Sequence, residues 1–253
     1  MMEHTSTIAG LDIGQSFSKA WKATKENIWL LAGFTVVYYI AYFILAMIPF
    51  VGGLAGFFSF IFGASVFAAY HIYEKKGSLE FSDFFSWSPR FSRLFLGHLL
   101  AIGISLLFLI PLVIAFVAFI GFSAIGAAIS NPEDIMSLFG PGFAVFLLLM
   151  LLLGVLFAVW LFAYPYLVQF TDMPLTEALR LSWKIGRNNI GQLILFLVLA
   201  IALTLLGAML LLIGLAVTTP LIMGVQFYFL RSIFPEQQEP EQWDFMNQPS
   251  PME

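Results

Sequence analysis

The chain has 253 residues, of which 60% are hydrophobic and only 10% carry a charge. Since a soluble globular domain has about 25% charged residues, this composition excludes a water-soluble fold and requires a surface that faces lipid. The formal net charge of −4 excludes a basic nucleic-acid-binding face, and the absence of cysteine excludes disulfides and thiolate chemistry.

Long stretches without Lys, Arg, Asp or Glu mark the membrane-spanning helices, because a bilayer core of about 30 Å needs roughly 20 apolar residues. We predict six spans, at residues 28–48, 53–73, 94–121, 142–171, 190–212 and 215–234. Residues 1–27 lack the pattern of a cleavable signal peptide, so the first span is expected to be an uncleaved insertion signal. The predicted fold class is an all-α polytopic bundle of one domain, residues 1–234, followed by a disordered acidic tail at 235–253.

Glycine and proline predict where these helices bend or stop. Pro111 predicts a kink in the third span because proline removes a backbone donor. The fourth span is expected to end in the aromatic cluster around Pro165, and Gly214 predicts the turn between the fifth and sixth spans. Residues 131–140 between spans three and four predict a short helix on the outer surface.

The basic residues predict how the chain is oriented in the membrane. All 11 Lys and Arg residues fall in segments on one predicted side of the membrane. The positive-inside rule makes this side cytoplasmic, and an even number of spans places both termini there.

Three cytoplasmic segments combine aromatic and basic residues at helical spacing, which is typical of helices that lie in the headgroup region. They cover residues 11–27, 79–93 and 175–189. Simple anchoring explains this pattern, and recognition of a particular lipid or docking of a partner is the alternative. The candidate headgroup contacts are Trp21, Lys22, Lys25, Trp87, Arg90, Arg93, Trp183, Lys184 and Arg187.

Small residues recur along one face of the second span, where they allow neighbouring helices to approach closely in lipid. This predicted packing face consists of Gly52, Gly56, Ser59 and Gly63. Packing within the chain is the simpler interpretation, and a subunit interface is the alternative.

Two parts of the sequence resemble each other. The pattern small-Trp-Lys-x-x-basic-x-Asn-Ile occurs at residues 20–28 and again at 182–190. Each copy begins in the cytoplasm and leads into two spans. We therefore predict a parallel repeat in which spans one and two correspond to spans five and six.

Residues 176–184 read TEALRLSWK and are followed by Asn189 and a long apolar stretch. Together with residues 81–85 before the third span, this segment resembles an EAL-x-x-SW signature of certain bacterial six-helix membrane proteins. They include the YciC-like family and the membrane domain fused to some glycerophosphodiester phosphodiesterases. The resemblance implies a six-helix architecture in a bacterial inner membrane and no particular chemistry.

No catalytic or cofactor-binding motif occurs in the sequence, and the predicted span cores contain no Lys, Arg, Asp or Glu. His98 in the third span is interpreted as structural, and Asp172 as the cap of a helix that begins near Pro174. Gln169, Gln192 and Gln226 lie near the ends of spans and are interpreted as bonding either between helices or to headgroups. We expect no enzymatic activity, no cofactor and no metal site.

Two classes of function remain open. The first is a scaffold, envelope-maintenance factor or regulator, whose partners are membrane lipids and either another membrane protein or a second copy of the chain. The second is a transporter or channel for an apolar or amphipathic, lipid-like solute, which an uncharged interior would allow. A closed bundle favours the first class, and a lateral groove or cavity favours the second.

Overall fold

The computed structural model describes residues 13–48, 59–130 and 141–234, with the side chains of 119–142 and 211–212 excepted. Within these ranges the secondary structure is entirely helical, which confirms the predicted fold class at this level. The α-helices are α1 (Ile13–Glu26), α2 (Ile28–Met47), α4 (Ser59–Lys76), α5 (Phe91–Ser130), α6 (Pro141–Leu161), α7 (Tyr164–Phe170), α8 (Leu175–Asn188), α9 (Ile190–Met209) and α10 (Leu211–Ile233). Two short 3-10 helices, η2 (Phe81–Phe85) and η3 (Ser88–Arg90), precede α5.

Five helical stretches in the described ranges are long and apolar enough to cross a membrane, namely Ile28–Met47, Phe81–Ala118, Phe143–Phe170, Ile190–Met209 and Ile213–Ile233. They overlap five of the six predicted spans. The remaining predicted span, 53–73, begins outside the described residues and continues as α4, which is not among the five. The predicted external helix at 131–140 and the tail at 235–253 also lie outside the described residues.

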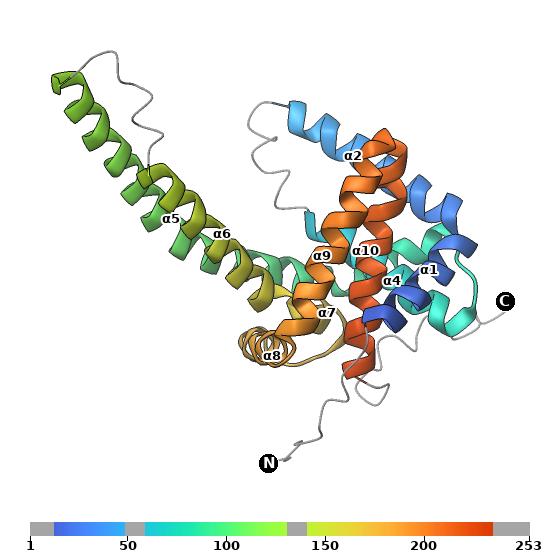
Figure 1. Ribbon diagram of the computed structural model, residues 1–253. Coiled ribbons are helices and arrows are strands. Elements are labelled where there is room, and N and C mark those ends of the chain that lie inside the picture. The colour runs from blue at the N-terminus through green and yellow to red at the C-terminus, as the bar shows by residue number, and fades with distance from the viewer. Residues whose placement is uncertain (1–12, 49–58, 131–140, 235–253) are drawn as a thin grey trace.

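α10 lies at the centre of the helical assembly, where it contacts α1, α2, α4 and α9. α5 and α6 run along each other as an arm that leads away from α2, α9 and α10 (Figure 1). Within this arm the ring of Phe116 stacks on that of Phe146, with centroids 3.6 Å apart. At its base, α5 contacts α4 and α7, so these helices meet where the arm leaves the assembly.

Two helix boundaries differ from the prediction. The turn between α9 and α10 lies at Leu210 rather than around Gly214. A Cβ on Gly214 would lie 2.8 Å from the Cα of Gly207, so this glycine permits close backbone contact instead of forming the turn. α5 is also longer than predicted, because the helix continues through Pro111 to Ser130.

Two helix pairs are joined by elbows of nearly the same geometry. Asn27 separates α1 from α2 with φ −123° and ψ 29°, and Asn189 separates α8 from α9 with φ −119° and ψ 27°. Each asparagine donates from Nδ2 to the carbonyl oxygen four residues earlier, Ala23 at 3.1 Å and Ile185 at 2.9 Å. In both pairs a 14-residue amphipathic helix leads into a 20-residue apolar one.

The segment predicted as an amphipathic helix at 79–93 instead forms η2, η3 and the start of α5. Two of its aromatic side chains point inward. Phe84 is fully buried, with its ring centroid 4.2 Å from that of Phe34. Trp87 is only 5% exposed and donates from Nε1 to Ser65 Oγ at 2.8 Å. Trp87 is thus a core residue, which corrects its interpretation as a headgroup contact.

Candidate functional site

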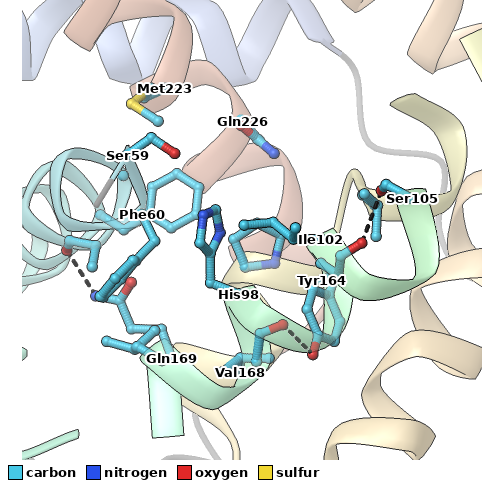
Figure 2. A pocket seen from close by; sticks show the side chains of 18 of the residues that line it. Ser59, Phe60, His98, Ile102, Ser105, Tyr164, Val168, Gln169, Met223 and Gln226 are labelled. Carbon is cyan, nitrogen blue, oxygen red and sulfur yellow. Dashed lines mark hydrogen bonds between the residues drawn. The ribbon is translucent and has the colours of Figure 1, made fainter. Parts of the chain in front are cut away.

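A cavity of about 380 Å³ lies at the base of the α5–α6 arm, between α4, α5, the junction of α6 with α7, and α10 (Figure 2). Its volume falls within the range of about 300–1,000 Å³ that is usual for small-molecule sites. Apolar side chains from all four walls dominate the lining, among them Phe60, Phe67, Ile102, Leu161, Val168 and Met223.

One wall of the cavity is a broken helix. The single fourth helix predicted from the sequence is interrupted, because α6 ends at Leu161 and α7 begins at Tyr164. Pro165 occupies the first turn of α7, where its missing N–H has no partner to lose but prevents α6 from continuing.

A serine from α8 satisfies the backbone at this break. Ser182 Oγ accepts a hydrogen bond from the amide of Ala163 at 3.2 Å and donates to the carbonyl oxygen of Trp160 at 2.6 Å. An unsatisfied backbone group in hydrocarbon costs several kcal/mol, so Ser182 stabilises the interruption. The small side chain in the repeated sequence pattern thus has a definite structural role.

Two glutamines bridge the walls of the cavity. Gln226 of α10 donates from Nε2 to the carbonyl oxygen of Phe162 at 2.6 Å, inside the helix break. Gln169 of α7 donates from Nε2 to that of Ala64 in α4 at 2.9 Å. Of the two interpretations open for these residues, bonding between helices is therefore the one that the structure shows.

Tyr164 and His98 complete the polar part of the lining. The Tyr164 hydroxyl donates to the carbonyl oxygen of Gly97 at 3.0 Å, which ties α7 to α5. His98 lies in the middle of the view in Figure 2, with its ring centroid 5.3 Å from that of Phe60. His98, which is interpreted from the sequence as structural, thus also lines the cavity.

Arg90 holds the connection between α7 and α8. This side chain is buried, donates to the carbonyl oxygens of Gln169 at 2.8 Å and Thr171 at 3.0 Å, and forms an ion pair with Asp172. The prediction that Asp172 caps α8 is wrong, because the N-cap residue is Pro174 and no side chain forms a capping hydrogen bond at this helix end. The carboxylate of Asp172 binds Arg90 instead.

Arg93 acts on the same connection from the first turn of α5. It donates from Nε to the carbonyl oxygen of Val168 at 3.0 Å and from an amino group to that of Met173. Arg90 and Arg93 therefore position α7 against α5 through the backbone. The burial of Arg90 corrects its interpretation as a headgroup contact, whereas Arg93 is only half-buried and its contact with headgroups stays a prediction.

The other candidate headgroup contacts lie on α1 and α8 and face outward. Trp21 is 42% exposed and Trp183 is 36% exposed. Contact of these two helices with lipid headgroups stays a prediction. The basic residues beside the two tryptophans are also exposed, namely Lys22, Lys25, Lys184 and Arg187.

The predicted small-residue face of the second span is described only in part. Gly52 and Gly56 lie outside the described residues. Ser59 and Gly63 both line the cavity, and a Cβ on Gly63 would lie 3.3 Å from Met223 Cε. Over its described part this face thus combines close packing against α10 with lining of the cavity.

Sequence reasoning did not identify the cavity, because its lining is drawn from segments between Ser59 and Gln226 that meet only in the fold. The usable signals were a proline inside a long apolar run and two glutamines in otherwise apolar helices. Within the described ranges, no three His, Asp or Glu side chains are grouped to hold a metal ion.

The helices and the cavity together define a helical protein with several candidate membrane-spanning helices and an apolar internal site. The chain belongs to the family described as "Domain of unknown function (DUF7847)", whose model matches residues 89–244. The match includes α5 to α10 and hence most of the cavity lining. No curated protein and no solved structure matches the chain. The resemblance to YciC-like proteins stays a prediction.

Proposed function

We propose that this protein is a six-span membrane protein that binds an apolar or amphipathic, lipid-like solute in the cavity beside the α6–α7 break. The observation that carries this proposal is an apolar space of about 380 Å³ against an interrupted candidate span. Interrupted helices form the substrate sites of many transporters. Of the two functional classes left open by the sequence, the cavity favours the one that handles a solute.

The break itself supports a role for the space beside it. An uninterrupted helix would satisfy all of its own backbone groups, whereas this one depends on side chains from two other helices. Ser182 of α8 and Gln226 of α10 supply those bonds. The chain thus maintains an irregular backbone at the wall where Tyr164 and Gln169 line the cavity (Figure 2).

Filling the cavity should reduce the amount of lipid that the protein retains. Ala101 lines the cavity on α5, so Ala101→Phe places a ring in the space that a solute would occupy. Leu107→Phe adds a ring to an exposed position of the same helix, where Leu107 is 70% exposed, and is the matched control. We expect Ala101→Phe to lower at least fivefold the lipid that mass spectrometry detects after purification in mild detergent. Equal retention by both variants and the wild type would contradict the proposal.

Association with another membrane protein or a second copy stays a prediction, and the same purification measures it through the proteins recovered with the chain.

The proposed topology places six spans between two cytoplasmic termini, with α4 as the second span. Side-chain bonds between helix ends support this arrangement, because they gather the charged ends of three helices. Tyr73 at the end of α4 donates to Glu26 at the end of α1, and Arg231 at the end of α10 pairs with Glu74 at 3.1 Å. The matching elbows at Asn27 and Asn189 support the parallel repeat that relates spans one and two to spans five and six.

Cysteine labelling tests this topology directly, because the natural sequence contains no cysteine. Lys184→Cys reports the predicted cytoplasmic side, and Met209→Cys, at a position 80% exposed, reports the outer end of α9. A membrane-impermeant maleimide added to intact cells is expected to label Met209→Cys at once and Lys184→Cys only after permeabilisation. Labelling of Lys184→Cys in intact cells would reverse the proposed orientation.

A further inference from the structure

The cavity combines two properties that restrict the chemistry of its occupant. None of its described lining residues is Lys, Arg, Asp or Glu. A carboxylate or phosphate placed there would have no opposite charge to pair with, and an unpaired buried charge is strongly unfavourable. The nearest arginines, Arg90 and Arg93, already donate to backbone carbonyl groups around α7. The lining therefore favours an uncharged occupant.

The hydrogen bonds of the lining define what polar group such an occupant needs. Four donors are already used within the protein. Ser105 binds Ala101, Tyr164 binds Gly97, and one N–H each of Gln169 and Gln226 binds Ala64 and Phe162 respectively. A neutral amide has two N–H donors and an acceptor oxygen. The second N–H and the Oε1 of Gln169, and the corresponding groups of Gln226, thus form no bond among the described residues and face any occupant of the cavity.

Gln169 is the critical residue because it is almost completely buried. Only 1% of it is exposed, and no hydrogen bond to its Oε1 occurs among the residues that the structure describes. Gln169 lines the cavity, so a group bound there can donate to this oxygen. Gln226 on the opposite wall has the same arrangement, with Nε2 bound to Phe162 and Oε1 accepting no bond from the described residues.

We infer that the cavity holds the hydroxyl end of an uncharged single-chain lipid, such as a fatty alcohol, with that hydroxyl bonded to the side-chain amide of Gln169. A hydroxyl donates and accepts at once, which matches the free Oε1 and N–H of one amide. A carboxylate or phosphate ester dianion only accepts and would oppose Oε1. This inference rests on the proposed function, because it assumes that the cavity is a lipid site.

The chain of such a lipid has a route out of the cavity. Two lining residues, Ser59 at the start of α4 and Leu106 on α5, are exposed, and Leu106 is 42% exposed. Apolar side chains dominate the rest of the lining. A lipid with its hydroxyl at Gln169 could therefore extend its chain between α4 and α5 toward the surrounding bilayer.

Four probes with the same C16 chain test the inference on the full-length protein in detergent: 1-hexadecanol, methyl hexadecyl ether, palmitate and hexadecyl phosphate. Binding is measured by competition with tritiated 1-hexadecanol. We expect 1-hexadecanol to bind about tenfold more tightly than its methyl ether, which has lost the donor, and than either anion. Gln169→Met should remove this preference, so that the alcohol and the ether bind alike, while Gln192→Met, on α9 outside the cavity lining, should keep it.

The outcomes separate the inference from the proposed function. If Ala101→Phe binds 1-hexadecanol as the wild type does, the cavity is not the lipid site and both fail. If Ala101→Phe abolishes binding but the four probes bind equally well, or an anion binds best, the cavity is a lipid site and the hydroxyl inference alone is overturned. Persistence of the alcohol preference in Gln169→Met also overturns it, and unchanged ether binding in that variant shows that its fold is intact.

Discussion

Replacing Arg90 by alanine is expected to lower the melting temperature of the purified protein by roughly 5–10 °C. The guanidinium is buried and donates to the carbonyl oxygens of Gln169 and Thr171. Hydrogen bonds to a charged donor contribute about 1.5–3 kcal/mol each, and their loss leaves two backbone acceptors without this partner. We therefore expect a loss of about 3 kcal/mol or more in the free energy of unfolding, measured by thermal denaturation in detergent.

Two further variants make this prediction specific to the geometry of Arg90. Arg90→Lys keeps the charge but cannot reproduce the planar fork that reaches Gln169, Thr171 and Asp172 together, so it should recover only a small part of the loss. Arg187→Ala removes an equally charged but exposed side chain from α8 and should change the melting temperature by no more than about 1 °C. An Arg90→Ala protein as stable as Arg187→Ala would show that the α7–α8 connection does not depend on this arginine.

The second large effect is expected at Gly186, where α8 crosses α6. A Cβ at this position would overlap the backbone carbonyl oxygen of Val159 and lie 2.9 Å from its Cγ1. Backbone cannot move aside as the end of a side chain can, so Gly186→Ala must push the two helices apart. Separation would also strain the bond from Ser182 to the carbonyl oxygen of Trp160 on the same pair of helices. We expect a destabilisation of about 2–3 kcal/mol in thermal denaturation.

Gly191→Ala is the matched control for this substitution. Gly191 lies just beyond Asn189 in α9, and a Cβ there would meet nothing within 4 Å. Alanine is favoured over glycine inside a helix by about 1 kcal/mol, so this variant should be as stable as the wild type or slightly more stable. If Gly186→Ala behaved in the same way, the close contact between α6 and α8 would be wrong.

The positions of most helices could be predicted from the sequence because bilayer thickness limits the length of an apolar helix. The first span was predicted at 28–48 and α2 covers Ile28–Met47; the fifth was predicted at 190–212 and α9 covers Ile190–Met209. The start of both is marked by an asparagine that ends the preceding helix. Such signals are local, since they depend on composition and on residues close together in the chain.

The break between α6 and α7 could be predicted only in part. Pro165 was visible inside a long apolar run, but proline alone does not decide between a kink, a helix end and a full interruption. The decision depends on whether another segment can satisfy the freed backbone groups. Ser182, 17 residues after Pro165, and Gln226 of α10 satisfy these groups. Whether the helix breaks therefore depends on tertiary contacts that the local sequence does not show.

Arg90 and Trp87 show why aromatic and basic residues near a span were misinterpreted. Their pattern is the same whether they face headgroups or pack inside the protein, because both settings need an apolar stem with a polar end. What distinguishes the two is the presence of acceptors nearby. Ser65 accepts from Trp87, and the end of α7 accepts from Arg90, and neither partner is close in sequence.

The break between α6 and α7, whose backbone groups Ser182 satisfies, affects how a ligand binds beside it. If that wall opened and Ser182 and Gln226 withdrew, the carbonyl oxygens of Trp160 and Phe162 would lose these hydrogen-bond donors. The wall of the cavity therefore has its final conformation before a ligand binds, so binding costs little conformational entropy. Such a rigid receptor selects by shape, and it should reject a branched or bulkier chain outright rather than adapt to it.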